Sequence, residues 1–202
     1  MKKIAILVEG ATEDAFKKKL CEFLQSRLEQ KPKLRFIRQD DPIPKEGKLK
    51  KIVENLLDND GCDAVIALTD VYTGKPDFKD SNDAKEKMMT WVDENPNFYP
   101  HTELHDFEAG LLPYWTTIKK LAKHNRSAPS GSPETVNHKK PPSYLIKEIF
   151  SSGTRGKDYK KVIDGMAILK NNDLMIAIDA CPELKAFVYR IISLCDEEKI
   201  IS

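Results

Sequence analysis

Four acidic side chains in this 202-residue sequence stand where extended segments are expected to end. They are Glu9, Asp70, Asp106 and Glu108. The carboxyl ends of parallel strands meet at one edge of a sheet, so we expect these carboxylates to gather there. Clustered carboxylates repel one another unless a cation lies between them. The pattern therefore predicts a bound Mg²⁺ or Mn²⁺ ion whose remaining coordination positions take water and phosphate oxygens.

Such an ion suits phosphodiester hydrolysis, because it polarises the phosphate and lowers the pKa of an attacking water. The candidate metal ligands are Glu9, Glu13, Asp70, Asp106 and Glu108. Glu13 and Asp106 also lie near expected helix starts, where capping and the helix dipole favour acidic residues, so a structural role explains them equally well. Glu9 and Asp70 each end a fully apolar run, which favours a functional role.

His101, Glu103 and His105 alternate along a segment expected to be extended, so they would share one face of a strand. That arrangement could indicate a zinc site. Solvated or edge positions are the favoured interpretation, because zinc sites with so sparse a ligand set are uncommon.

The elements that must position these acids follow from the apolar pattern. Residues 4–8 and 64–68 are continuous apolar runs, as in strands covered by helices on both sides, and 34–37 and 98–104 are also expected to be extended. Apolar residues at helical spacing separate them. Alternating strands and helices predict an α/β fold with a mostly parallel sheet flanked by helices.

The chain is expected to divide into an α/β core over 1–126, a proline-rich loop over 127–143 and a helical C-terminal extension over 144–202 that packs on the core. Within the extension, short helices are expected at 144–150, 159–171 and 182–194.

The composition limits the classes of function. A formal net charge of +1 excludes the bulk positive field of a non-specific nucleic-acid coat, so any nucleic-acid contact must be local. The four scattered cysteines have no paired spacing, and the apolar run near the N-terminus is too short for an export signal. We therefore expect a soluble cytoplasmic protein without a membrane-spanning segment.

A series of motifs extends these expectations. It comprises Val8-Glu9-Gly10-Ala11-Thr12-Glu13, Thr69-Asp70-Val71-Tyr72-Thr73-Gly74-Lys75-Pro76, Leu104-His105-Asp106-Phe107-Glu108-Ala109, Ser132-Pro133-Glu134-Thr135-Val136-Asn137, Tyr159-Lys160-Lys161-Val162, Gly165 and Cys181-Pro182-Glu183-Leu184. In order and approximate spacing, this series resembles the TOPRIM-like bacterial family called domain of unknown function 4276. The resemblance implies a TOPRIM-type parallel sheet and, commonly, a neighbouring ATPase gene. Related TOPRIM nucleases of overcoming-lysogenisation-defect and phage-defence systems cut nucleic acid with metal ions.

The resemblance also assigns roles by position. Glu9 matches the TOPRIM glutamate and Asp70 the first aspartate of the usual Asp-x-Asp pair, whereas Tyr72 replaces the second aspartate. Glu108, alone or with Asp106, is the candidate for the missing acid, and Lys161 fits a basic residue near phosphate. The implied function is a metal-dependent nuclease acting on DNA or RNA, with these four charged residues as its catalytic set and an ATPase as its partner in anti-phage defence.

A different class of function stays open. Tyr72 and the near-neutral charge also fit a non-catalytic partner or sensor subunit that docks on an ATPase and binds metal or nucleotide without cutting. Where basic residues are expected after Ser143, the chain has Tyr144 and Leu145, so that part of a phosphate site is not matched. The sequence leaves both strandedness and a homodimer open.

Overall fold

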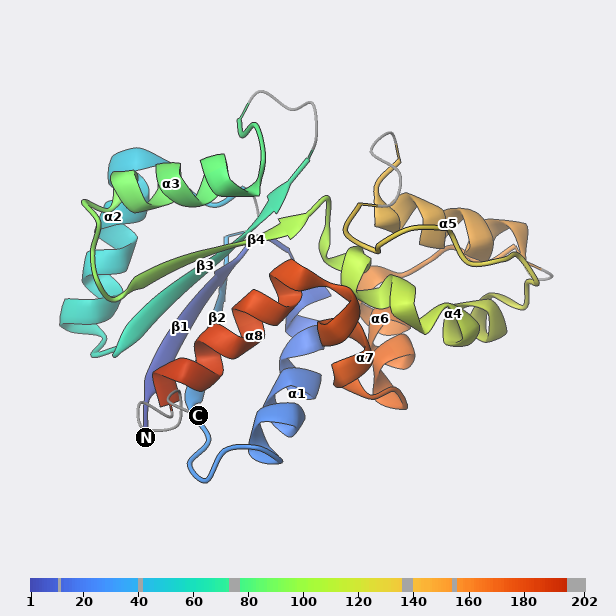
Figure 1. Ribbon diagram of the computed structural model, residues 1–202, viewed down its shortest axis with the longest axis horizontal. Helices are drawn as coiled ribbons and strands as arrows, with labels where there is room; N and C mark the ends of the chain where they lie inside the picture. Colours follow the sequence, from blue (N-terminus) through green and yellow to red (C-terminus); the bar gives the residue numbers. More distant parts are fainter. Residues whose placement is uncertain (11, 40–41, 73–76, 136–139, 154–155, 196–202) are drawn as a thin grey trace.

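The computed structural model describes residues 1–10, 12–39, 42–72, 77–135, 140–153 and 156–195. These residues form a four-stranded sheet in the order β2-β1-β3-β4, and all of its strand pairs are parallel (Figure 1). The strands are β1 (Lys3–Val8), β2 (Lys33–Arg38), β3 (Ala64–Val71) and β4 (Phe98–Leu104). The predicted α/β class is confirmed.

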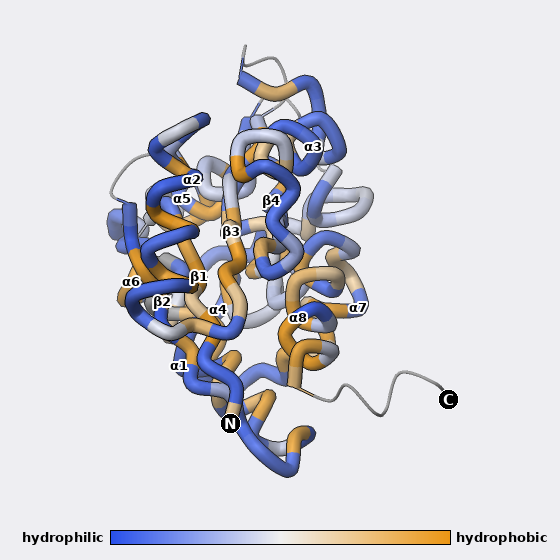
Figure 2. Tube along the Cα trace, turned by 90° about the vertical axis from the view of Figure 1, so that its left-hand side faces the viewer, coloured by the Kyte–Doolittle hydropathy of each residue, from blue (hydrophilic) through white to orange (hydrophobic). Residues whose placement is uncertain are grey.

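Helices cover both faces of the sheet, because successive strand residues point to opposite sides and both sets are apolar. Ile4 and Ile6 of β1 join a core with one helical layer, whereas Ala5 and Leu7 join a core with the other. In Figure 2, β1 and β3 are coloured mainly as apolar, whereas α3 is mainly hydrophilic. The second layer contains α2 (Glu46–Glu54), a π-helical turn at Asn55–Asn59 and α3 (Ser81–Trp91).

The first layer combines α1 with the C-terminal helices. α1 contacts α6, α8 contacts β4, and one apolar cluster joins them to the sheet (Figure 1). The elements are α1 (Thr12–Gln25), a 3₁₀ helix η2 (Phe107–Tyr114), α4 (Trp115–Ala122), α5 (Pro142–Ser152), α6 (Lys161–Lys170), α7 (Leu174–Ala180) and α8 (Pro182–Cys195). Residues 144–202 thus include helices that complete the sheet's cover.

The structure corrects several expected boundaries. β3 continues through Asp70 to Val71, so Asp70 lies within the strand and does not follow it. The helix expected after Asp106 is divided into η2 and α4. α5 begins at Pro142, inside the expected loop, because proline is tolerated in the first turn of a helix. α7 was not predicted.

Other expectations concern cysteines and membrane segments. All four cysteines are thiols. No helix within the described ranges has the length and apolar composition needed to cross a bilayer.

Candidate functional site

The order of the strands defines a preferred place for a ligand. The chain passes from β1 to β2 on one side, and from β3 to β4 on the other. The carboxyl ends of β1 and β3 therefore form a topological switch point, where open α/β sheets bind ligands. Glu9 directly follows β1, and Thr69 and Asp70 lie near the end of β3, so the strongest sequence-predicted candidates meet at this point.

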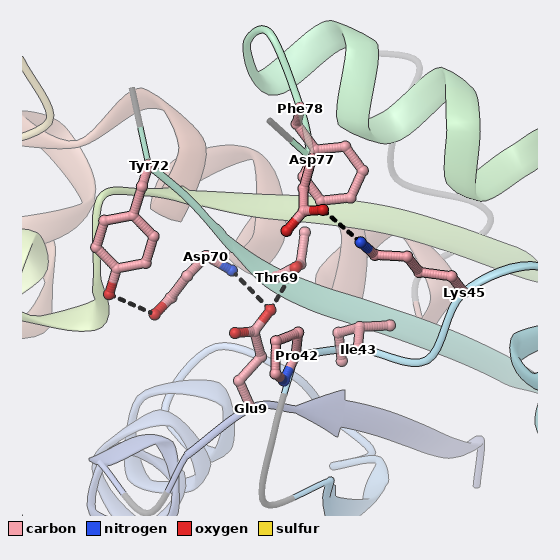
Figure 3. A pocket seen from close by; sticks show the side chains of 9 residues that line it. All are labelled: Glu9, Pro42, Ile43, Lys45, Thr69, Asp70, Tyr72, Asp77 and Phe78. Carbon is pink, nitrogen blue, oxygen red and sulfur yellow. Dashed lines mark hydrogen bonds and ion pairs between the residues drawn. The ribbon is translucent and has the colours of Figure 1, made fainter. Parts of the chain in front are cut away.

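Glu9 is held against β3 by two hydrogen bonds. Its Oε1 accepts one hydrogen bond from the Thr69 hydroxyl and another, of 3.1 Å, from the Asp70 backbone N–H (Figure 3). Burial raises the pKa of the Glu9 carboxyl, although these hydrogen bonds oppose the rise. Among the described residues, neither Glu9 nor Asp70 forms an ion pair with lysine or arginine. Their charges therefore lack a cationic partner there.

Glu9 lines a small pocket with a volume of about 50 Å³. This volume suits one or a few water molecules or a partly hydrated ion, and it is too small for a nucleotide. At its rim, Lys45 Nζ and Asp77 Oδ1 form an ion pair at 2.5 Å (Figure 3). The other lining residues are Pro42, Ile43, Thr69, Asp70, Tyr72 and Phe78.

Asp70 faces the opposite side of the sheet from Thr69, because adjacent strand residues alternate. Its Oδ2 accepts a hydrogen bond of 3.3 Å from the Tyr72 hydroxyl. In the β3–β4 register, Asp70 pairs with Glu103. The pKa of Asp70 lies well above its ordinary value of 3.8 because the carboxyl is desolvated and other acids repel its charge. Those acids are Glu9, Glu13, Asp106 and Glu108.

Asp106 and Glu108 are fully enclosed beside Asp70. Asp106 was a candidate helix cap, but its side chain makes no cap hydrogen bond and instead accepts the Ser143 backbone N–H at 3.3 Å. Glu108 Oε2 lies 3.4 Å from Lys161 Nζ. Burial, and then repulsion by Asp106, raises the pKa of Glu108 to about 7, and Lys161 opposes the rise. Lys161 therefore neutralises part of the acidic set.

The backbone at His105 joins β4 to these acids. His105 has a φ of 75°, a left-handed conformation that costs energy for a residue with a Cβ. Its N–H donates to the Val71 carbonyl at 2.9 Å, which ties this turn to the end of β3. The strained turn thereby places Asp106 beside Asp70.

Glu13 has a visible structural role. The Gly10 N–H donates to Glu13 Oε1 at 3.3 Å, as an acid in the first turn of a helix commonly accepts from the preceding backbone. Glu13 is nevertheless buried and contributes to the repulsion at Asp70 and Glu103. Glu13 thus belongs both to the start of α1 and to the buried acidic cluster, and its role as a metal ligand stays a prediction.

Glu103 is the site residue that the sequence interpretation missed. The expectation of solvated positions is wrong for His101, Glu103 and His105, which are all buried. Among the residues described, Glu103 Oε2 has no hydrogen-bond partner. Desolvation and repulsion, with Asp70 the strongest repelling neighbour, hold the pKa of Glu103 well above its ordinary value. Its alternation with the two histidines indicated a shared face of the strand. The sequence did not show, however, that α8 would cover β4.

The donor chemistry fits a hard divalent cation. Within the described part of the chain, no three His, Cys, Asp or Glu side chains are already arranged to hold a metal ion. Mg²⁺ is, however, commonly held by only one or two carboxylates, with waters and substrate phosphates completing the octahedron. Glu9 and Asp70 are close enough for their charges to repel, and a cation held in this open way would relieve that repulsion.

The comparison with protein-family models supports the family resemblance that the motifs of this chain indicate. The model of the family described as domain of unknown function (DUF4276) matches residues 8–192. The chain belongs to the DUF4276 family. No curated protein and no solved structure matched it. Within this DUF4276 member, the matched span contains every acid of the candidate site, together with Lys161.

Proposed function

We propose that this DUF4276 protein is a divalent-metal-dependent nuclease that hydrolyses phosphodiesters in DNA or RNA. The observation that carries the proposal is the meeting of Glu9 with Asp70 at the switch point of the sheet. The raised pKa of Asp70, together with those of Glu103 and Glu108, supports it, because natural proteins concentrate such unfavourable charge where function requires it.

The side chains have distinct roles in this proposal. Glu9 and Asp70 would hold Mg²⁺ or Mn²⁺, which, when bound, supplies Lewis-acid polarisation of the phosphate. Glu9 can also accept the proton of the attacking water, since burial moves its pKa toward neutrality. Glu108 lies deeper and orients Lys161, whose side chain is still 46% exposed and can meet a phosphate at the rim.

The TOPRIM relationship, an ATPase partner and a role in anti-phage defence belong to the same proposal. They rest on the ordered motifs described above. A cytoplasmic location remains a prediction from the sequence, and a homodimer remains open.

The proposal is tested by measuring cleavage of single- and double-stranded DNA and RNA in Mg²⁺, Mn²⁺ or EDTA. Glu9→Gln and Asp70→Asn should each lower the metal-dependent rate by about 100-fold or more, because positioned charge provides most of the catalysis of phosphoryl transfer. The matched control is Asp63→Asn at the other end of β3, where the side chain only accepts the Lys3 N–H and an asparagine still can.

Two outcomes would contradict the nuclease proposal. If no substrate is cut with either metal, by the protein alone or together with any ATPase encoded beside its gene, the nuclease proposal is wrong. Equal rates for the wild type and both site variants would mean that any observed cleavage comes from elsewhere.

A non-catalytic sensor or partner subunit of an ATPase complex is the second candidate. The Tyr72 hydroxyl, which donates to Asp70 where TOPRIM enzymes have a second aspartate, favours it. This candidate predicts metal binding that depends on Glu9 and Asp70 without cleavage of any nucleic acid.

A further inference from the structure

A second groove lies next to the acidic site. It is formed by the outer face of α5 and the segment before α6, and it has a volume of about 440 Å³, within the range of pockets for small organic ligands. We call it the Tyr144 groove, and its lining residues are Tyr144, Lys147, Glu148, Ser151, Asp158 and Tyr159. In Figure 1, α5 lies beyond the carboxyl ends of the strands.

The groove is connected to the acidic centre at two points. The Tyr159 hydroxyl, on the groove wall, lies 3.5 Å from Glu108 Oε1. Ser143, next to Tyr144 in the chain, donates its backbone N–H to Asp106. A ligand in the groove would therefore lie one side chain away from Glu108, whose partner Lys161 is proposed to meet the phosphate.

An exposed aromatic ring lines this groove, and two lysine ammonium groups lie in it or beside it. Tyr144 is 45% exposed, although a residue of its size is usually more buried. Lys140 Nζ lies 4.6 Å from the centre of the Tyr144 ring, and Lys147, one helical turn further along α5, is exposed on the same face. This combination provides a flat surface for a base and cations for the adjoining phosphates.

The charges of the groove also favour a polyanion. The Glu148 carboxylate forms an ion pair with Arg126 at 2.6 Å, so its charge is already compensated. Asp158 is the other carboxylate on the groove wall, which also carries Lys147. Lys140 does not line the groove, but its Nζ lies over the Tyr144 ring and adds a second positive charge beside it.

We propose that the Tyr144 groove binds one unpaired base of a single-stranded nucleic acid, stacked on Tyr144, with Lys140 and Lys147 contacting the phosphates on either side. This inference rests on the proposed nuclease function and specifies its substrate class. A duplex cannot use the groove in this way, because its bases already stack on one another and present only their edges.

Binding is measured by fluorescence anisotropy with labelled 12-nucleotide single strands and duplexes of the same sequence, in EDTA and in Ca²⁺. The wild type should bind the single strand at least 10-fold more tightly than the duplex. Tyr144→Ala should weaken single-strand binding by about 5- to 150-fold, as expected for the loss of one base–aromatic stack, and Tyr144→Trp should restore it. Lys147→Gln should reduce the salt dependence of binding by about 0.7 in log–log slope.

The matched control is Tyr189→Ala on α8. Tyr189 is 49% exposed and has Lys185 Nζ 5.7 Å from its ring centre, but it does not line the groove. Single-strand binding should be unchanged in this variant. Equal affinity for single strands and duplexes, no binding of either, or equal losses from Tyr144→Ala and Tyr189→Ala would overturn the inference.

The two proposals can fail separately. Tyr144-dependent binding of single strands without any cleavage would retain the groove's role and refute the nuclease. Metal-dependent cleavage of single strands and duplexes at equal rates, unaffected by Tyr144→Ala, would retain the nuclease and refute the groove's role.

Discussion

Removing one charge from the buried acids should stabilise the metal-free protein, and Glu108→Gln provides the sharpest case. The pKa of Glu108 rises from its ordinary 4.5 to about 7, mainly through burial. The folded state therefore binds the proton more tightly than the unfolded state, and the free energy of unfolding falls as pH rises from 4.5 through 7. At 1.36 kcal/mol per pH unit, the full cost above pH 7 is about 3 kcal/mol.

Glu108→Gln keeps the shape and removes this cost. In EDTA at pH 8, the variant should be more stable than the wild type by up to about 3 kcal/mol, which corresponds to about 6–12 °C in Tm for a chain of this length. At pH 4 the difference should vanish. Saturating Mg²⁺ should reduce the difference at pH 8, because the cation offsets the same repulsion in the wild type.

Chemical denaturation at pH 4 and pH 8, in EDTA and in Mg²⁺, measures these differences. Glu86→Gln on the exposed side of α3 is the control, and it should stay within about 0.5 kcal/mol of the wild type throughout. The reasoning is refuted if Glu108→Gln is less stable than the wild type in EDTA at pH 8, or if its effect is the same at both pH values.

Two further predictions concern the structural supports of the site. Glu134 accepts the backbone N–H groups of Glu183 and Leu184 at the start of α8, so Glu134→Ala should lower the free energy of unfolding by about 1–2 kcal/mol in urea denaturation; an unchanged midpoint would contradict this. Burial lowers the pKa of His101 to about 4, and the positive charges of Lys85 and Arg190 add to this effect. Stability should therefore be lost as pH falls from 6.5 toward 4, by up to about 3 kcal/mol, and His101→Gln should be less acid-sensitive than the wild type when both are unfolded at pH 7 and pH 4.5.

The strands and most helices were predictable because their signals are local. An apolar run such as 4–8 identifies a buried strand, and apolar spacing identifies the helix that follows. The meeting of Glu9 and Asp70 was predictable for a related reason, since the ends of neighbouring parallel strands share one edge. The sequence did not specify which strands are neighbours, and that order places both residues at the switch point.

The remaining parts of the site depend on contacts between distant segments. Asp106 looked like a helix cap because its local context fits one, but Ser143, 37 residues later, provides its hydrogen bond. Lys161 was expected beside phosphate, and it reaches Glu108 across 53 positions. No periodicity encodes such pairings.

The burial of Glu103 has the same origin. The start of α8 lies against β4, where the Thr102 hydroxyl donates to Glu183 Oε2 at 3.2 Å across 81 positions. Until that helix is placed, an acid on an edge strand is reasonably interpreted as solvated. The structure therefore adds Glu103 to the predicted acidic residues of the site, because only the tertiary fold buries its carboxyl group.

Titration of the metal-free protein with Mn²⁺, followed by electron paramagnetic resonance, tests the central claim that these carboxylates coexist by sharing a cation. The wild type and Asp63→Asn should bind Mn²⁺ alike, and Glu9→Gln and Asp70→Asn should each weaken binding at least 10-fold. Wild-type protein that leaves all the Mn²⁺ free in solution, or binding that is equal in all four proteins, would contradict the claim.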